Sequence, residues 1–229
     1  SAASDVYKRQ LLMSDQNLKR RGLLCVVSGP SGSGKTTLCR RFSEEDSDAV
    51  YAVSATTRAP RNGEQDGIDY FFLTQKEFEA RTTRGEFLEY AEVHGNYYGT
   101  LKSEVLNHIE AGRDVLMDID VQGAALVRGQ DDPAIQKALV DIFILLPSEE
   151  ELIKRLNFRG TETQDQIDLR LKNAHEEMRH WQLYLYTVVS ADKETDFSSF
   201  SAILAGERCR SSRLIPRAES SSDHPELDL

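Results

Sequence analysis

This sequence lacks both a membrane-spanning segment and an excess of positive charge. No apolar run comes near the roughly 20 residues that a transmembrane helix requires. Acidic residues outnumber basic ones, 38 to 28, and the formal net charge is -10. Because nucleic-acid backbones and anionic lipids attract basic surfaces, we expect no nucleic-acid and no membrane partner, although local arginine clusters could still bind phosphate.

Cysteine is scarce as well. Cys25, Cys39 and Cys209 are widely spaced, which excludes a disulfide framework and fits no metal-ligand pattern. No secretory signal is evident, so we expect a reducing compartment, the cytoplasm. The apolar fraction of 39% and the charged fraction of 29% over 229 residues fit one globular domain with small inserted lobes.

The two ends of the chain carry little folding signal. We expect residues 1–21 to be a disordered extension, because the first ten, SAASDVYKRQ, have no periodicity and look like translated adapter sequence. Met13 is then the expected natural start, and a genuine polar arm is the alternative. Residues 210–229 are polar and serine-rich, which predicts a mobile tail.

The most informative stretch is Leu23–Thr37, LLCVVSGPSGSGKTT. An apolar run predicts a buried strand, and the spacing of Leu38 and Phe42 predicts a helix after the glycine-rich turn. Glycines let backbone N–H groups surround phosphate oxygens; Lys35 would reach the β- and γ-phosphates and the Thr36 hydroxyl would ligate Mg²⁺. We infer that the chain binds a nucleoside triphosphate. Its predicted phosphate-binding residues are Gly29, Pro30, Ser31, Gly32, Ser33, Gly34, Lys35, Thr36 and Thr37.

Strand and helix patterns alternate along the rest of the chain, which predicts an α/β core with a mostly parallel sheet flanked by helices. A cluster of short aromatic strands predicts a small β-rich lobe inserted into that core. Ligands of such sheets bind at the carboxyl ends of the strands. The predicted strands after the first are Ala49–Ser54, Asp69–Leu73, Phe87–Val93, Asn96–Thr100, Val115–Asp120, Asp141–Leu146 and Thr187–Ser190.

Two carboxylates, Asp118 and Asp120, end an apolar strand pattern. A strand that presents a carboxylate beside a phosphate-binding loop is typical of a Mg²⁺ shell, and alternation would put both side chains on one face. The alternatives for Asp118 are a helix N-cap and a structural ion pair.

Arginines form two further groups. Arg58 and Arg61 flank a proline in a polar loop, where they could clamp a dianionic phosphate with bidentate hydrogen bonds. Arg155 and Arg159 share one face of a predicted helix, and Arg170 follows on the next. These three could stabilise charge on a transferring phosphoryl group. For every one of these arginines, a solvated surface charge is the alternative.

Five stretches in this order carry a family resemblance: GPSGSGKTT, SATTRAPRNGEQDGIDYFF, FLEYAEVHGNYYGT, DIDVQG and KRLNFRGTE. From about Gly22 to Arg208 the chain closely resembles bacterial-type guanylate kinases, which are P-loop nucleoside monophosphate kinases. The resemblance implies phosphoryl transfer from ATP to GMP, giving ADP and GDP, with Mg²⁺ as cofactor. It implies one domain, 22–209, whose core (22–53, 105–147, 179–209) carries a GMP-binding lobe (54–104) and a helical lid (148–178).

The resemblance also implies roles for individual residues. GMP or dGMP is the expected acceptor, and a homodimer is possible. Arg58, Arg61, Tyr70 and Tyr98 would hold the GMP phosphate; Ser54, Glu89 and Thr100 would read the guanine; Asp118 and Asp120 would complete the GMP side. Lys35, Arg155, Arg159 and Arg170 would be catalytic, and Thr36 and Asp118 would bind Mg²⁺, partly through water. A carboxylate is acceptor-only, so Glu89 suits the N1–H and 2-amino donors of guanine.

The chain departs from the family at one place. Guanylate kinases usually carry Asn-Asp-Asp after the last strand, with the asparagine near the ATP base, whereas this chain has Ser190-Ala191-Asp192. The shorter serine could weaken ATP affinity or relax the preference for adenine, without touching the phosphates.

Two other functions compete with this interpretation. Guanylate-kinase-like modules of membrane-associated scaffolds bind phosphopeptides without catalysis, but they have lost the working P-loop that is complete here. A related sugar-phosphate kinase shares the P-loop and parts of the fold; Ser54, Glu89 and Tyr98 argue against it.

Overall fold

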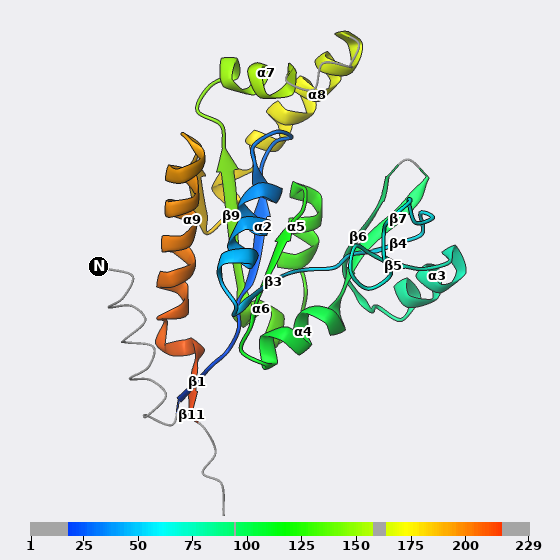
Figure 1. Cartoon of the computed structure of the whole chain (residues 1–229), viewed down its shortest axis with the longest axis vertical. Coiled ribbons are helices and arrows are strands. Elements are labelled where there is room, and N and C mark those ends of the chain that lie inside the picture. Colours follow the sequence, from blue (N-terminus) through cyan, green and yellow to red (C-terminus); the bar gives the residue numbers. More distant parts are fainter. Residues whose placement is uncertain (1–17, 94, 158–163, 217–229) are drawn as a thin grey trace, which may run out of the picture.

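The computed structural model describes residues 18–93, 95–157 and 164–216. Its centre is a five-stranded sheet in the order β10-β9-β2-β8-β3, with every neighbouring pair parallel (Figure 1). The strands are β2 (Leu24–Ser28), β3 (Ala49–Tyr51), β8 (Asp114–Asp118), β9 (Leu139–Leu145) and β10 (Tyr186–Val189). Parallel strands need crossover connections, which helices supply here, so the predicted α/β core is confirmed.

Helices cover both faces of this sheet, and the alternation of side chains along each strand creates two cores. Leu23, Cys25 and Val27 face one core, whereas Leu24 and Val26 face the other. The first core is completed by α2 (Lys35–Glu45) and α9 (Lys193–Arg208). The second is completed by α4 (Lys102–Glu110), α5 (Val121–Arg128) and α6 (Pro133–Ala138).

A second sheet forms the lobe, which projects to one side of the core in Figure 1. Its order is β5-β4-β7-β6. The elements are β4 (Ala55–Thr56), β5 (Phe71–Phe72), α3 (Gln75–Thr83), β6 (Phe87–Val93) and β7 (Asn96–Leu101). Phe78 of α3 stacks between Phe87 and Tyr97, with ring centroids 4.2 and 5.3 Å away. The lobe therefore has a small aromatic core of its own.

The lid consists of α7 (Glu149–Asn157) and α8 (Gln164–Met178), which lie beyond the carboxyl end of the central sheet (Figure 1). Leu146, Leu152 and Ala174 bury one another where the two helices meet the core. A 3₁₀ turn, η1 (Trp181–Leu183), leads from α8 back to β10.

Both chain ends depart from our expectation. We expected 1–21 and 210–229 to lie outside the fold, but β1 (Leu18–Arg20) pairs antiparallel with β11 (Leu214–Pro216). The remaining parts of these two expectations, 1–17 and 217–229, lie outside the described residues. These segments meet below the core at the end opposite the lid (Figure 1). The sequence did not predict this pairing, because strands of three residues are too short to show a periodic pattern.

A buried arginine fixes the return of the chain to this small sheet. Arg213 ends a 3₁₀ turn, η2 (Ser211–Arg213), and is only 4% exposed. Its guanidinium donates to Glu207 Oε2 at 2.7 Å and to the Lys137 carbonyl at 2.7 Å. The ion pair with Glu207 and the hydrogen bond to the Lys137 carbonyl thus hold this polar segment, which has few apolar side chains to pack.

Three strand predictions extended well beyond the observed strands. Of the expected strand Asp69–Leu73, only Phe71–Phe72 forms β5. The expected strand Ala49–Ser54 is shorter in the structure, because β3 ends at Tyr51 and the chain then crosses into the lobe. The Val115–Asp120 pattern ends at Asp118, since Asp120 is the N-cap of α5. Within the described residues, none of the helices is long and apolar enough to cross a membrane.

Candidate functional site

The glycine-rich turn has the predicted strand, loop and helix geometry. It leaves β2 at Ser28 and enters α2 at Lys35. Gly29, Gly32 and Gly34 all have positive φ, and a Cβ on Gly29 would lie 2.4 Å from the Ile144 carbonyl oxygen. Only glycine meets both conditions without strain. The loop therefore wraps tightly over the carboxyl end of the central sheet.

Lys35 points back into this loop. Its Nζ donates to the carbonyl oxygens of Gly29 at 2.6 Å and Pro30 at 3.1 Å. Burial lowers the pKa of Lys35, and the carboxylates of Glu177 and Asp118 oppose that shift. The ammonium therefore lies where a phosphate held by the loop amides would meet it.

Ser33 adds a second polar group to the same loop. Its hydroxyl is buried and has no hydrogen-bond partner among the residues that the structure describes. A buried unpaired hydroxyl is costly, so it indicates a group that pairs with a bound ligand.

Asp118, at the end of β8, accepts hydrogen bonds from two hydroxyl groups. Thr36 Oγ1 donates to one carboxylate oxygen and Tyr51 Oη donates to the other. The contact between Thr36 and Asp118 confirms that the loop and the predicted carboxylate meet. Hard oxygen donors of this kind suit Mg²⁺. In the described part of the chain, no group of three or more His, Cys, Asp or Glu could hold a metal by itself.

Asp120 does not share the strand face with Asp118, so that prediction is wrong. Its Oδ1 accepts from the Gly123 N–H at 2.7 Å and caps α5. The carboxylate still lies near the site: it raises the pKa of Glu89 and also acts on Lys35. The charge of Asp120 therefore acts on Glu89 of the lobe and on Lys35 of the phosphate-binding loop.

Glu89 is the buried carboxylate of the lobe. It lies on β6 next to a register shift, is 8% exposed, and accepts from Thr100 Oγ1 of β7 at 2.8 Å. Burial raises the pKa of Glu89. Thr100 occupies one acceptor position, and the carboxylate has further lone pairs for a ligand. Ser54, which we also expect at the guanine, pairs with Phe71 through its backbone carbonyl at 2.9 Å.

Arg58 is held at the edge of the lobe. Its guanidinium donates to both carboxylate oxygens of Glu64, at 2.8 and 3.0 Å, and lies 5.4 Å from the Tyr70 ring centroid. This pairing raises the pKa of Arg58 and lowers the pKa of Glu64. The rings of Tyr70 and Tyr98 are 6.1 Å apart. Arg61 joins the cluster through its N–H, which donates to Glu64 at 2.6 Å.

The lid brings two of its three predicted arginines to the loop. Arg155 Nε donates to Glu151 at 2.7 Å, and Arg170 Nη2 donates to Ser31 Oγ at 2.9 Å. Arg155 of α7 lies next to the loop: a Cβ at position 32 would be in ordinary van der Waals contact with Arg155 Cβ, at 3.4 Å. Arg159 lies outside the described residues.

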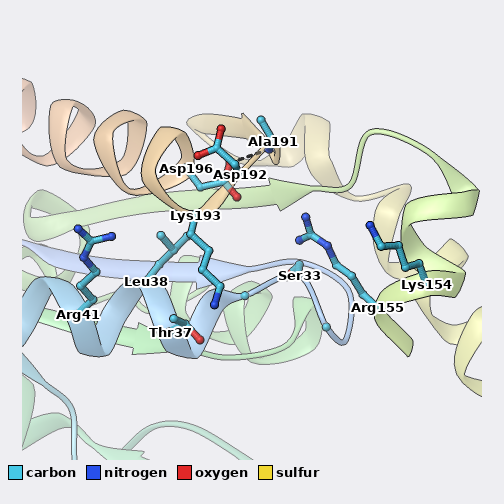
Figure 2. Close-up of a pocket in the computed structure, with 12 residues that line it drawn as sticks. Ser33, Thr37, Leu38, Arg41, Lys154, Arg155, Ala191, Asp192, Lys193 and Asp196 are labelled. Atoms are coloured by element: carbon cyan, nitrogen blue, oxygen red, sulfur yellow. Dashed lines mark hydrogen bonds between the residues drawn. The ribbon is translucent and has the colours of Figure 1, made fainter. Parts of the chain in front are cut away.

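A pocket of about 580 Å³ opens between the loop, α2, α7 and the start of α9 (Figure 2). In Figure 2, Arg155 reaches into it from α7, while Lys193 extends across it from α9 toward Thr37. The pocket therefore adjoins the phosphate-binding loop on the side away from the lobe, where the rest of a nucleotide would fit.

Four site residues were missed by sequence reasoning. Tyr51 contacts Asp118, Glu64 anchors Arg58, Glu177 acts on Lys35, and Asp196 lines the pocket. Only Glu64 left a signal, an acidic residue six positions after Arg58 in one polar loop.

Comparisons with known proteins agree with this geometry. The family model described as guanylate kinase matches residues 21–206. A guanylate kinase of Clostridium perfringens (strain SM101) is 44% identical over 203 residues, covering 89% of this chain and 92% of the relative. One of Bartonella quintana is 46% identical over 195 residues, covering 85% and 86%.

The fold is also similar to that of a solved structure. The crystal structure of guanylate kinase from Anaplasma phagocytophilum aligns with a TM-score of 0.66 at 34% identity, covering 86% of this chain and 92% of that chain. With the family model spanning most of the sequence, the chain belongs to the guanylate kinase family.

Proposed function

We propose that this chain transfers the γ-phosphoryl group of ATP to GMP, giving ADP and GDP, through the residues described above. The observation that carries the proposal is Glu89, a buried carboxylate of the lobe that keeps acceptor capacity beyond its bond from Thr100, in a chain whose phosphate-binding loop is complete. The proposal places a guanine-reading carboxylate and a triphosphate-binding loop in one site.

The donor would bind to the phosphate-binding loop. Pro30 has no N–H and the Ser33 N–H donates to the Pro30 carbonyl at 3.1 Å. The other backbone N–H groups of the loop would donate to phosphate oxygens, and the start of α2 adds a positive dipole end. Lys35 would neutralise charge on the β- and γ-phosphates, and the Ser33 hydroxyl would gain a partner there. The remainder of ATP would extend into the pocket shown in Figure 2.

The acceptor would bind to the lobe. Arg58, held by Glu64, would pair with the GMP phosphate together with Arg61, Tyr70 and Tyr98. Glu89, Thr100 and Ser54 would hydrogen-bond the guanine. Adenine lacks the 2-amino donor, so it would leave the buried Glu89 oxygens unsatisfied. GMP and dGMP share the groups that these residues read, and both are proposed as substrates.

Thr36 and Asp118 would hold Mg²⁺, partly through water, because their oxygens are the donor type that this ion prefers. Bound there, the ion would offset charge on the β- and γ-phosphates. Tyr51 would keep the Asp118 carboxylate in place. Asp120 would contribute negative charge on the GMP side while it caps α5.

No protein base is needed, because a GMP phosphate oxygen is already an anionic nucleophile. Catalysis then rests on positioning and on charge stabilisation by Lys35, Arg155, Arg159 and Arg170. Movement of the lid over the substrates would exclude water and so prevent hydrolysis of ATP. The cytoplasmic setting, the homodimer and the division of the chain into core, GMP-binding lobe and lid stay predictions.

The test is ADP release from Mg·ATP with GMP, using AMP, CMP, UMP and a ribose phosphate as controls. Turnover with GMP and not with the others is the expected result. Lys35→Ala and Arg155→Ala are each expected to lower kcat by at least about 10³-fold, because such groups act on the transferring phosphoryl. Both should keep the wild-type melting temperature. ATP binding without turnover of any acceptor would contradict the proposal.

A further inference from the structure

A buried serine and a buried aspartate connect the core to the lid arginine. Ser190 follows β10 and is 2% exposed, and its Oγ donates to Asp196 Oδ2 at 2.6 Å. The same oxygen accepts from Arg155 Nη1 at 3.1 Å. Asp196 is 7% exposed, and its other oxygen accepts from the Ala191 N–H at 2.7 Å, the bond drawn in Figure 2.

The chemistry of the three groups fixes the direction of this chain of bonds. A carboxylate only accepts and a guanidinium only donates. The Ser190 hydroxyl must therefore give its proton to Asp196 and offer its lone pairs to Arg155. Asp196 lies in the first turn of α9, where the helix dipole favours a negative charge. The bond to Asp196 thus orients the Ser190 hydroxyl so that its oxygen can accept from the Arg155 guanidinium.

Arg155 is held from two directions at the edge of the phosphate-binding loop. Glu151, one turn earlier on α7, accepts from its Nε at 2.7 Å, and Ser190 accepts from its Nη1. Arg155 lies next to Gly32 of the loop, where a Cβ would be 3.4 Å from Arg155 Cβ and 3.7 Å from the Arg155 carbonyl oxygen. A bond from the lid and a bond from the core together leave the guanidinium few other orientations.

We propose that Ser190 and Asp196 are positioning residues, which hold Arg155 in the orientation that stabilises the transferring phosphoryl group. This inference rests on the proposed function. It gives the serine a different role from the asparagine of similar proteins, which is expected near the ATP base. The Ser190 hydroxyl already has a donor and an acceptor partner, so it is not directed at the base.

The decisive comparison is Ser190→Thr against Ser190→Val. The two side chains have nearly the same size, and only threonine keeps the hydroxyl. We expect kcat of the valine variant to be about tenfold or more below that of the threonine variant, the loss typical of a hydrogen bond to a charged group. KM for GMP should be the same in both. Ser190→Ala, which adds no atoms to the buried site, should show the same fall in kcat when it is assayed well below its melting temperature, which falls because Asp196 loses its hydroxyl partner.

A double-mutant cycle tests whether the serine acts through the arginine. In an Arg155→Ala background, measured at high enzyme concentration, the threonine and valine variants should have equal kcat. A gap of the same size in that background would overturn the proposal. So would a valine variant with unchanged kcat, a raised KM for ATP and an altered preference between ATP and GTP, because that pattern belongs to a base contact.

The wild-type assay separates the two levels of the inference. Wild-type enzyme that releases ADP without regard to GMP would overturn the proposed function and the positioning role with it. GMP-dependent wild-type turnover with equal kcat in the threonine and valine variants would overturn the positioning role alone.

Discussion

Glu89 is the residue on which acceptor selectivity depends. Glu89→Gln replaces one acceptor oxygen by an N–H₂ donor, which would face the donors of guanine. We expect kcat/KM for GMP to fall by about 100-fold or more, since a polar pocket discriminates strongly when its groups are mispaired. Steady-state kinetics with GMP measures this. Glu92→Gln, on the exposed part of the same strand, is the matched control and should match wild type.

The protonation of Glu89 predicts a pH dependence. Burial raises its pKa, so the side chain takes up a proton at a higher pH than an ordinary glutamate does. The protonated form has lost acceptor capacity, and KM for GMP should therefore rise as pH falls through the raised pKa. The phosphate of GMP also titrates in mildly acidic solution. The Glu89→Gln variant isolates that contribution, and an identical pH profile in both enzymes would contradict the prediction.

Single residues could be predicted where a local motif fixes their role. The spacing G-x-x-x-x-G-K-T was enough for Lys35 and Thr36, because the loop geometry is set within eight residues. Tyr51 was not predictable, since its partner Asp118 lies 67 residues later and reaches it only through the strand pairing of β3 and β8. Contacts of this kind depend on the fold and leave no mark in either segment.

At the scale of elements, α3 shows how a short helix is fixed to the lobe. It begins with a capping box: the Glu77 N–H donates to Thr74 Oγ1 at 3.2 Å, and the Thr74 N–H donates to Glu77 at 2.8 Å. Phe78 follows directly and fills the aromatic core of the lobe. The cap therefore stabilises the helix that carries Phe78, which is only 1% exposed in the core of the lobe.

Removal of this cap should destabilise the lobe. We expect Thr74→Ala to lower the free energy of unfolding by about 1 kcal/mol, the usual cost of a lost N-cap. Thr74→Ser keeps the hydroxyl and should stay close to wild type. Urea denaturation followed by circular dichroism measures both variants. Equal stability of the alanine and serine variants would show that the hydroxyl does not support the helix.

Elements with a long apolar run were predictable, and short ones were not. The strands β2, β6 and β9 were expected close to their observed positions because buried parallel or half-buried strands are rich in Val, Ile, Leu and Phe. The helices α5 and α6 were missed. With eight and six residues, they are too short for a 3.6-residue period to stand out.

At the scale of the whole molecule, the order of the central sheet could not be inferred. Its alternation with helices predicted a parallel sheet, but β2 lies between β9 and β8, which are far away in sequence. The link between the chain ends was equally hidden. This link depends on buried charged side chains, and from composition alone charged residues are expected at the surface.

Asp114 is the charged group that joins the most distant parts of the chain. It is fully buried and pairs with Arg20 of β1 and, at 2.6 Å, with Arg208 of α9. It also accepts from the Leu23 N–H at 2.9 Å. Arg208 donates in addition to Asp46 at the end of α2, at 2.6 Å. One carboxylate thus connects the sheet, the terminal strands and two helices at the end of the molecule opposite the site.

Asp114→Asn should therefore unfold the protein more easily without changing its chemistry. Loss of one partner from a buried charge network costs about 3–5 kcal/mol, because the remaining charges stay desolvated. Asp46→Asn is the matched control: its side chain is 28% exposed, and we expect a loss of about 1 kcal/mol or less. Urea denaturation measures the free energy of unfolding of both variants. We expect kcat, measured well below the melting temperature, to equal that of the wild type in both, because Asp114 lies at the opposite end of β8 from Asp118. Equal losses in the two variants would mean that the terminal network is only a surface feature, and a lowered kcat in a fully folded Asp114→Asn enzyme would mean that it reaches the active site.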